Sequence, residues 1–102
     1  METIGLALVG CGGFSRDRAQ EALQRTGMYR VVTCHDVDAS AARQAAERFG
    51  ATRCAQFAEA IEADGVEAVA VMTPNHLHRE QVAASLAVGK HVFVEKPMAN
   101  TT

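Results

Sequence analysis

The feature that most constrains this chain is a glycine-rich turn within the stretch Leu6-Ala7-Leu8-Val9-Gly10-Cys11-Gly12-Gly13-Phe14-Ser15-Arg16. Residues 4–9 are nearly all apolar, as in a parallel strand covered on both faces. Gly10 permits the dihedral angles of a tight turn, and Gly12 has no side chain to keep a ligand off the backbone. The helix that follows would offer unpaired N–H groups and the positive end of its dipole. Strand, glycine turn and helix N-terminus in this order predict the phosphate-binding part of a dinucleotide fold.

The third small position of this glycine pattern is Ser15. Serine still lets the helix and the strand approach closely, and its hydroxyl would help to hold a phosphate. Glycine turns of this kind also occur in loops that bind no nucleotide, so the rest of the chain has to decide between the two interpretations.

Composition limits the class of protein. The chain has 102 residues, which suits one domain, and combines 48% hydrophobic with only 5% aromatic residues, as in packed α/β layers. A net charge of −2 and a pI near 6.0 provide no basic surface for nucleic acid or an anionic membrane. The three cysteines form no Cys-x-x-Cys pair and indicate small buried residues in a reducing compartment. Without a long apolar run, and with a strand starting at residue 4, we expect a cytoplasmic protein.

Apolar periodicity divides the chain into alternating strands and helices. The predicted strands are residues 4–9, 29–36, 51–55, 66–72 and 91–94. The predicted helices cover residues 15–26, a segment capped by Asp38 or Ser40, a short stretch around 57–61, and residues 75–88, with glycine stops at Gly27, Gly50 and Gly89. The expected inner faces are Ala19, Ala22, Leu23 and Thr26 in the first helix and Ala42, Ala45, Ala46 and Phe49 in the second. The alternation predicts one Rossmann-type, doubly wound parallel sheet over residues 1–102. Its strand order would be 3-2-1-4-5, with a crevice between strands one and four.

Asp36 stands at the end of the predicted second strand. A carboxylate there would accept hydrogen bonds from both hydroxyls of an adenosine ribose and would repel a 2′-phosphate. Val37 offers no cation to bind that phosphate, so NAD is expected rather than NADP. Alternatively, Asp36 only caps the turn into the next helix.

Thr73, Pro74 and Asn75 directly follow the predicted fourth strand, at the edge where an open α/β sheet binds its ligand. The hydroxyl and the amide would bond a cofactor or a substrate, or they form an ordinary helix-capping turn. His76 and His78 are two residues apart and would point in different directions on a helix, so a metal pair is not predicted. We expect His78 to face solvent or the crevice.

Glu95, Lys96 and Pro97 end the predicted fifth strand at the same edge. An oxidised nicotinamide beside Lys96 would favour the neutral amine, which can take part in acid–base chemistry at the substrate hydroxyl. The other interpretation is a charged pair that leaves an edge strand.

These residues resemble the N-terminal half of the Gfo/Idh/MocA oxidoreductases, a family named for glucose–fructose oxidoreductase and inositol dehydrogenase. The resemblance covers nearly the whole chain, and its two later signatures are more specific than the glycine loop. The matching stretches are the glycine loop with Arg16, His35-Asp36 through Phe49-Gly50-Ala51, Thr73-Pro74-Asn75-His76-Leu77-His78, and Gly89-Lys90-His91-Val92-Phe93-Val94-Glu95-Lys96-Pro97. Phe14 and Ser15 depart from the usual aliphatic–glycine pair, and Arg18 stands where a histidine is common.

The resemblance implies a nicotinamide-dependent dehydrogenase or reductase that acts on a sugar, cyclitol or related polyol. It implies Lys96 as the catalytic residue that contacts substrate, and it assigns Asp36 to the adenosine ribose and Glu95 to the nicotinamide ribose. The remaining implied cofactor contacts are Gly10, Gly12, Gly13, Phe14 and Ser15 at the pyrophosphate, and Thr73, Pro74, Asn75 and His78.

Members of this family continue into a second domain that carries further catalytic residues and the subunit interface, so we expect this chain to be a fragment of a longer homo-oligomeric protein. Alone, it is expected to bind a dinucleotide weakly and not to turn over substrate. The alternative is a non-catalytic dinucleotide-sensing or interaction module on the same fold. A methyltransferase that binds S-adenosylmethionine also combines a glycine loop with a strand-two carboxylate, but it leaves Glu95, Lys96 and Pro97 unexplained.

Overall fold

The computed structural model describes residues 3–12, 18–73 and 75–94, without the side chains of Asn75 and His76. These residues form a five-stranded parallel sheet in the order β3-β2-β1-β4-β5. The strands are β1 (Ile4–Val9), β2 (Tyr29–His35), β3 (Thr52–Arg53), β4 (Ala68–Val71) and β5 (His91–Val94). The helices are α1 (Gln20–Thr26), α2 (Ala39–Phe49), α3 (Phe57–Glu62) and α4 (Asn75–Ala87). The predicted α/β class and strand order are therefore confirmed.

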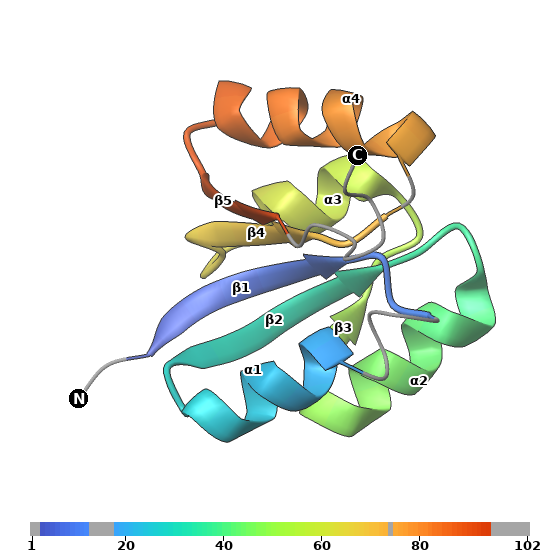
Figure 1. Ribbon diagram of the computed structural model, residues 1–102, viewed down its shortest axis with the longest axis vertical. Helices are drawn as coiled ribbons and strands as arrows, with labels where there is room; N and C mark the ends of the chain where they lie inside the picture. Colours follow the sequence, from blue (N-terminus) through green and yellow to red (C-terminus); the bar gives the residue numbers. More distant parts are fainter. Residues whose placement is uncertain (1–2, 13–17, 74, 95–102) are drawn as a thin grey trace, which may run out of the picture.

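Helices cover both faces of the sheet (Figure 1), with α1 and α2 on one side and α3 and α4 on the other. This division follows from right-handed crossovers, because the chain winds outward from β1 to β3 and then returns to wind outward through β4 and β5. No helix in the described ranges combines the length and the apolar character needed to cross a membrane.

The central strand β1 supplies the core on both faces. Leu6 and Leu8 point into the cluster under α1 and α2, whereas Ala7 and Val9 point into the cluster under α3 and α4. All four side chains are fully buried. This alternation on a wholly apolar strand is what a parallel sheet covered on both faces requires.

The ends of the helices follow the predicted signals. Asp38 caps α2, since its Oδ1 accepts hydrogen bonds from the backbone N–H groups of Ser40 (2.9 Å) and Ala41 (3.4 Å). Gly27 and Gly50 end α1 and α2 with φ of 70° and 68°, the left-handed conformation that glycine adopts most easily. The predicted inner face of α2 is also confirmed, with Ala42, Ala45 and Ala46 buried and Phe49 packed beside them.

Three strands are shorter than predicted, and β2 is shorter by only one residue, since it ends at His35. The edge strand β3 contains only two residues, because it pairs only with Thr33 and Cys34 of β2. Before β4, the backbone N–H of Val66 donates to the carbonyl oxygen of Ala63 in a turn, and that of Glu67 donates to the carbonyl oxygen of Gly5 on β1 (2.8 Å). The paired register with β1 then runs from Ala68 to Val71.

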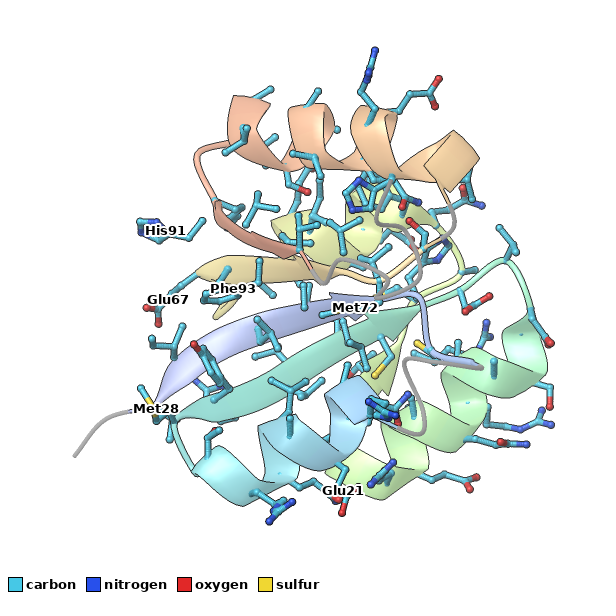
Figure 2. The ribbon with its side chains drawn as sticks, in the orientation of Figure 1. Glu21, Met28, Glu67, Met72, His91 and Phe93 are labelled. Carbon is cyan, nitrogen blue, oxygen red and sulfur yellow. The ribbon has the colours of Figure 1, made fainter. Side chains whose placement is uncertain are left out.

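The predicted inner face of α1 is only partly correct. Ala19 is buried, but Ala22 and Thr26 are exposed. The physical reason is that no described helix covers β4 and β5 on the side of α1. An apolar hollow therefore remains there, and it includes Met72 and Phe93, which are labelled in Figure 2. Its full lining is Ala19, Ala22, Leu23, Thr26, Tyr29, Ala70, Met72 and Phe93.

Candidate functional site

The carboxyl ends of β1, β2 and β4 meet at Gly10. Its N–H donates to the carbonyl oxygen of His35 (2.9 Å), and the N–H of Met72 donates to the carbonyl oxygen of Val9 (2.7 Å). Gly10 has φ of 96°, and a Cβ at this position would lie only 2.7 Å from the carbonyl carbon and oxygen of Met72. Gly10 therefore has to be glycine, for both its dihedral angle and its close packing, at the point where the sequence predicts a crevice between strands one and four.

Asp36 lies against the glycine loop. Its Oδ2 accepts a hydrogen bond from the backbone N–H of Cys11 (2.7 Å), and its Oδ1 accepts one from the N–H of Asp38 (2.8 Å). The side chain is half-buried. Each carboxylate oxygen has a second acceptor position, so these two bonds leave acceptor capacity for the hydroxyls of a ribose. The alternative role of Asp36 as a turn-former is present as well, through its bond to Asp38.

Gln20 is a residue that the sequence analysis missed. Its side chain is buried at 1% exposure, and its Nε2 donates to the carbonyl oxygen of Cys11 (2.8 Å). Its Oε1 accepts a hydrogen bond from Nη1 of Arg48 on α2 (3.3 Å). Cys11 is thus held through its N–H by Asp36 and through its carbonyl by Gln20. The only sequence signal was a polar residue next to Ala19, within a segment that was interpreted from its apolar positions.

At the end of β4, the hydroxyl of Thr73 donates to Oε1 of Gln81 on α4 (2.6 Å). Both side chains are half-buried. Gln81 was also missed, because it lies two turns into a helix that was interpreted from its first residues. His78 is half-buried on α4, so it is neither fully exposed nor part of the core. Its predicted place in the crevice stays a prediction.

Several predicted site residues cannot be placed, because they lie outside the described residues. These are Gly13, Phe14, Ser15, Pro74, Glu95 and Lys96, together with the side chain of Asn75, whose backbone begins α4. The strand before Glu95 is described, and its last residue, Val94, pairs with Val71 at the carboxyl end of β4.

The thiols of Cys11 and Cys34 are buried beneath the loop. The Cys11 Sγ lies 3.4 Å from the carbonyl oxygen of His35. A hydrogen bond with the side chain of Cys34, followed by burial, raises the pKa of the Cys11 thiol above its ordinary value. A protonated, buried thiol is a packing group rather than a nucleophile. Cys54 is only half-buried, so the expectation of three buried cysteines holds for two.

Among the described residues, no group of three or more His, Cys, Asp or Glu side chains is arranged to hold a metal ion. The apolar hollow beside α1 lies on the face of the sheet rather than at the carboxyl edge that Gly10, Asp36 and Thr73 share. The polar groups that could orient a ligand therefore gather at the carboxyl edge, which we take as the site.

Comparison of this chain with known proteins identifies a family of related sequences and solved structures with the same fold. The sequence model of an oxidoreductase family with an NAD-binding Rossmann fold, GFO_IDH_MocA, matches residues 4–102. The chain is 35% identical over 101 residues to an inositol 2-dehydrogenase of Ralstonia nicotianae, an alignment that covers 97% of this chain and 30% of that protein.

Solved structures agree. The 3-ketoreductase KijD10 from Actinomadura kijaniata, in complex with NADP and TDP-benzene, superposes with a TM-score of 0.86 at 32% identity, covering 95% of this chain and 30% of KijD10. GenD2 from gentamicin A biosynthesis, in complex with NAD, superposes with a TM-score of 0.85 at 35% identity, covering 96% of this chain and 28% of GenD2. The chain therefore spans about 30% of the length of the proteins that it matches.

Proposed function

This chain belongs to the Gfo/Idh/MocA oxidoreductase family and has its NAD-binding Rossmann fold, and from that premise we propose that it is the cofactor-binding part of an oxidoreductase. The reaction is the transfer of a hydride between a nicotinamide cofactor and a CH–OH group. The substrate is a sugar, cyclitol or related polyol. This class is supported by the names of similar proteins, an inositol 2-dehydrogenase and a 3-ketoreductase in complex with a TDP compound.

The observation that carries the proposal is the contact between Asp36 Oδ2 and the backbone N–H of Cys11. It places a carboxylate with spare acceptor capacity directly beside a loop whose Gly10 leaves no room for a side chain. A dinucleotide needs this pair of features, since one end of the adenosine diphosphate is a diol and the other is an anion. The residues present therefore fit the cofactor.

NAD is the proposed cofactor. The Asp36 carboxylate would repel a 2′-phosphate, and its neighbour Val37 is 82% exposed and carries no charge. Discrimination of this kind acts by leaving the competing group without a partner. Similar structures hold NAD or NADP, so the preference rests on these two residues of this chain.

Each residue has a proposed role. The glycine loop, from Gly10 to Ser15 and including Gly12, Gly13 and Phe14, holds the pyrophosphate, and Thr73 and His78 border the nicotinamide half together with Pro74 and Asn75. The bound cofactor supplies the position that accepts or gives the hydride. Glu95 contacts the nicotinamide ribose, and Lys96 holds the substrate hydroxyl and moves its proton.

The rest of the substrate pocket is proposed to come from a longer polypeptide, because the chain spans about 30% of its relatives. That polypeptide is proposed to be a homo-oligomer of the cytoplasm. The proposed partner is a small-molecule substrate, and neither nucleic acid nor a membrane is a proposed partner.

The first test is a titration of this chain with NADH and NADPH, followed by nicotinamide fluorescence. Weak binding with NADH tighter than NADPH is expected, without turnover of inositol or other polyols. A chain that binds neither dinucleotide contradicts the proposal.

The second test separates an enzyme from the alternative, a non-catalytic dinucleotide-sensing module. In the longer protein that contains this chain, Lys96→Met should abolish polyol oxidation and retain NADH binding. A longer protein that binds NADH but oxidises none of a panel of sugars and cyclitols would favour the sensing module.

A further inference from the structure

The side chain of Gln20 connects three parts of the molecule. It belongs to α1, donates from Nε2 to the carbonyl oxygen of Cys11 in the glycine loop, and accepts at Oε1 from Arg48 of α2. At 1% exposure it is among the largest fully buried side chains of the described residues. An amide side chain can donate to a carbonyl through its nitrogen and accept from a guanidinium through its oxygen at once.

The bond from Gln20 sets the orientation of one peptide group. The carbonyl of Cys11 and the N–H of Gly12 belong to the same peptide unit, and none of the described peptide bonds is cis. In a trans peptide the C=O and the N–H point in opposite directions. Since the carbonyl points toward the buried amide of Gln20, the N–H of Gly12 points away from it.

The backbone N–H of Cys11, the residue before Gly12, already donates a hydrogen bond. Asp36 accepts the bond from the N–H of Cys11, so the two peptide units that flank Cys11 are oriented by two different side chains. Gly12 lies beside α2, where an added Cβ would be in ordinary van der Waals contact with the Cβ of Ala41 at 3.5 Å. A backbone held on both sides can present its N–H to an anion without rearranging first.

We propose that Gln20 is a positioning residue for pyrophosphate recognition: it holds the Cys11–Gly12 peptide so that the N–H of Gly12 is directed at the diphosphate. Arg48 in turn fixes the rotamer of Gln20. The proposal rests on the proposed function, because it assumes that this loop binds a dinucleotide. It adds a residue of α1 that touches no ligand and acts through the backbone.

The chain offers a matched control. Gln24 lies one turn further along α1 and also accepts from Arg48, through Nε (3.0 Å) and Nη2 (2.8 Å). Gln24 is exposed, and both of these bonds connect it to Arg48 rather than to the loop. Gln20→Met and Gln24→Met therefore remove the same functional group from the same helix, and only the first releases the carbonyl of Cys11.

The test is an amide NMR titration of the wild-type, Gln20→Met and Gln24→Met chains with NADH, ADP and adenosine. We expect Gln20→Met to weaken the binding of NADH and ADP by about tenfold and to change the binding of adenosine little. Gln24→Met should leave the affinity for all three ligands within about twofold of the wild type. The Gly12 amide resonance should shift strongly with ADP in the wild type and weakly in Gln20→Met. Equal losses for all three ligands, or equal behaviour of the two variants, would overturn the positioning role.

If Gln20→Met does not fold, the Arg48→Met variant provides a second test. It removes the bond from Nη1 of Arg48 to Oε1 of Gln20, so the binding of ADP should weaken by about threefold and the binding of adenosine should not. An Arg48→Met chain that binds ADP like the wild type would overturn the proposal. A wild-type chain that binds neither NADH nor ADP would instead refute the proposed function, and the positioning role with it.

Discussion

The Oδ2 atom of Asp36 accepts a 2.7 Å hydrogen bond from the backbone N–H of Cys11, across 25 residues of sequence. The end of β2 is therefore tied directly to the glycine loop. A residue proposed to choose the cofactor also holds the loop in shape, so its removal should affect more than the ribose.

Asp36→Ala should weaken NADH binding by about 30-fold, since a charged acceptor is lost to both the ribose and the loop, worth about 2 kcal/mol. NADPH should not gain more than a small factor, because Val37 supplies no cation. Asp38→Ala is the control: it removes the cap of α2, costing about 1 kcal/mol of stability, and should leave the NADH to NADPH ratio unchanged. Calorimetric titration with both dinucleotides measures this ratio. An unchanged NADH affinity in Asp36→Ala would remove Asp36 from the site.

Gly10→Ala should destabilise the chain by about 2–5 kcal/mol, because the positive φ is unfavourable for alanine and the new Cβ overlaps the carbonyl of Met72. Gly27→Ala is the matched control, since Gly27 also has positive φ but has no atom within 4 Å of the added Cβ. It should cost only about 1–2 kcal/mol. Urea unfolding of the two variants measures the difference. Equal losses of stability would mean that Met72 moves away from the added Cβ without an energetic cost.

The Thr73–Gln81 hydrogen bond gives a prediction for the nicotinamide half of the site. Because the hydroxyl donates to Gln81, its oxygen remains to accept from a ligand. Thr73→Val and Gln81→Leu should each weaken NADH binding by about three- to tenfold and leave ADP binding unchanged. The double variant should lose less binding free energy than the sum of the two single losses. Gln81→Glu keeps the acceptor and should bind NADH like the wild type. Additive losses, or a loss of ADP affinity, would speak against this pairing.

The pKa of Cys11, raised by its bond to Cys34 and by burial, predicts how stability depends on pH. The folded chain keeps the Cys11 proton above the ordinary thiol pKa of 9.0, where the unfolded chain loses it. This contribution is therefore complete below about pH 9 and declines as the pH rises further, by up to about 1.4 kcal/mol per pH unit. The same bond lowers the pKa of Cys34, and burial alone would raise it in a Cys11→Ala variant, so both thiols are removed together. Urea unfolding between about pH 8 and pH 10.5 should show a shallower decline in Cys11→Ala/Cys34→Ala than in the wild type. Identical slopes would contradict the prediction.

The sequence was sufficient where local signals and burial agreed. In α2, the cap at Asp38, the small residues Ala42, Ala45 and Ala46 and the stop at Gly50 all agree with the structure. The strand order followed from the alternation, the handedness of the crossovers and the strand order that doubly wound dinucleotide folds share.

It was insufficient where tertiary contacts decide. Ala22 and Thr26 carry the periodicity of a buried face but border a hollow, because burial depends on what covers β4 and β5. Gln20 and Gln81 lie within helices and form bonds to residues at strand ends, and no periodicity encodes such partners. The predicted roles of Lys96 and Glu95 remain predictions.

The central position of β1 has a kinetic consequence. Leu6 pairs with Val31 on β2 and with Ala68 on β4, and the second contact closes a much longer loop. Because longer loops cost more entropy to close, we expect β1 and β2 to associate before β4 arrives. The contact between Gly10 and Met72 is then expected to form late, after the transition state in which β1 and β2 associate. NADH should therefore slow the unfolding of this chain and leave its folding rate nearly unchanged, which stopped-flow measurements can resolve.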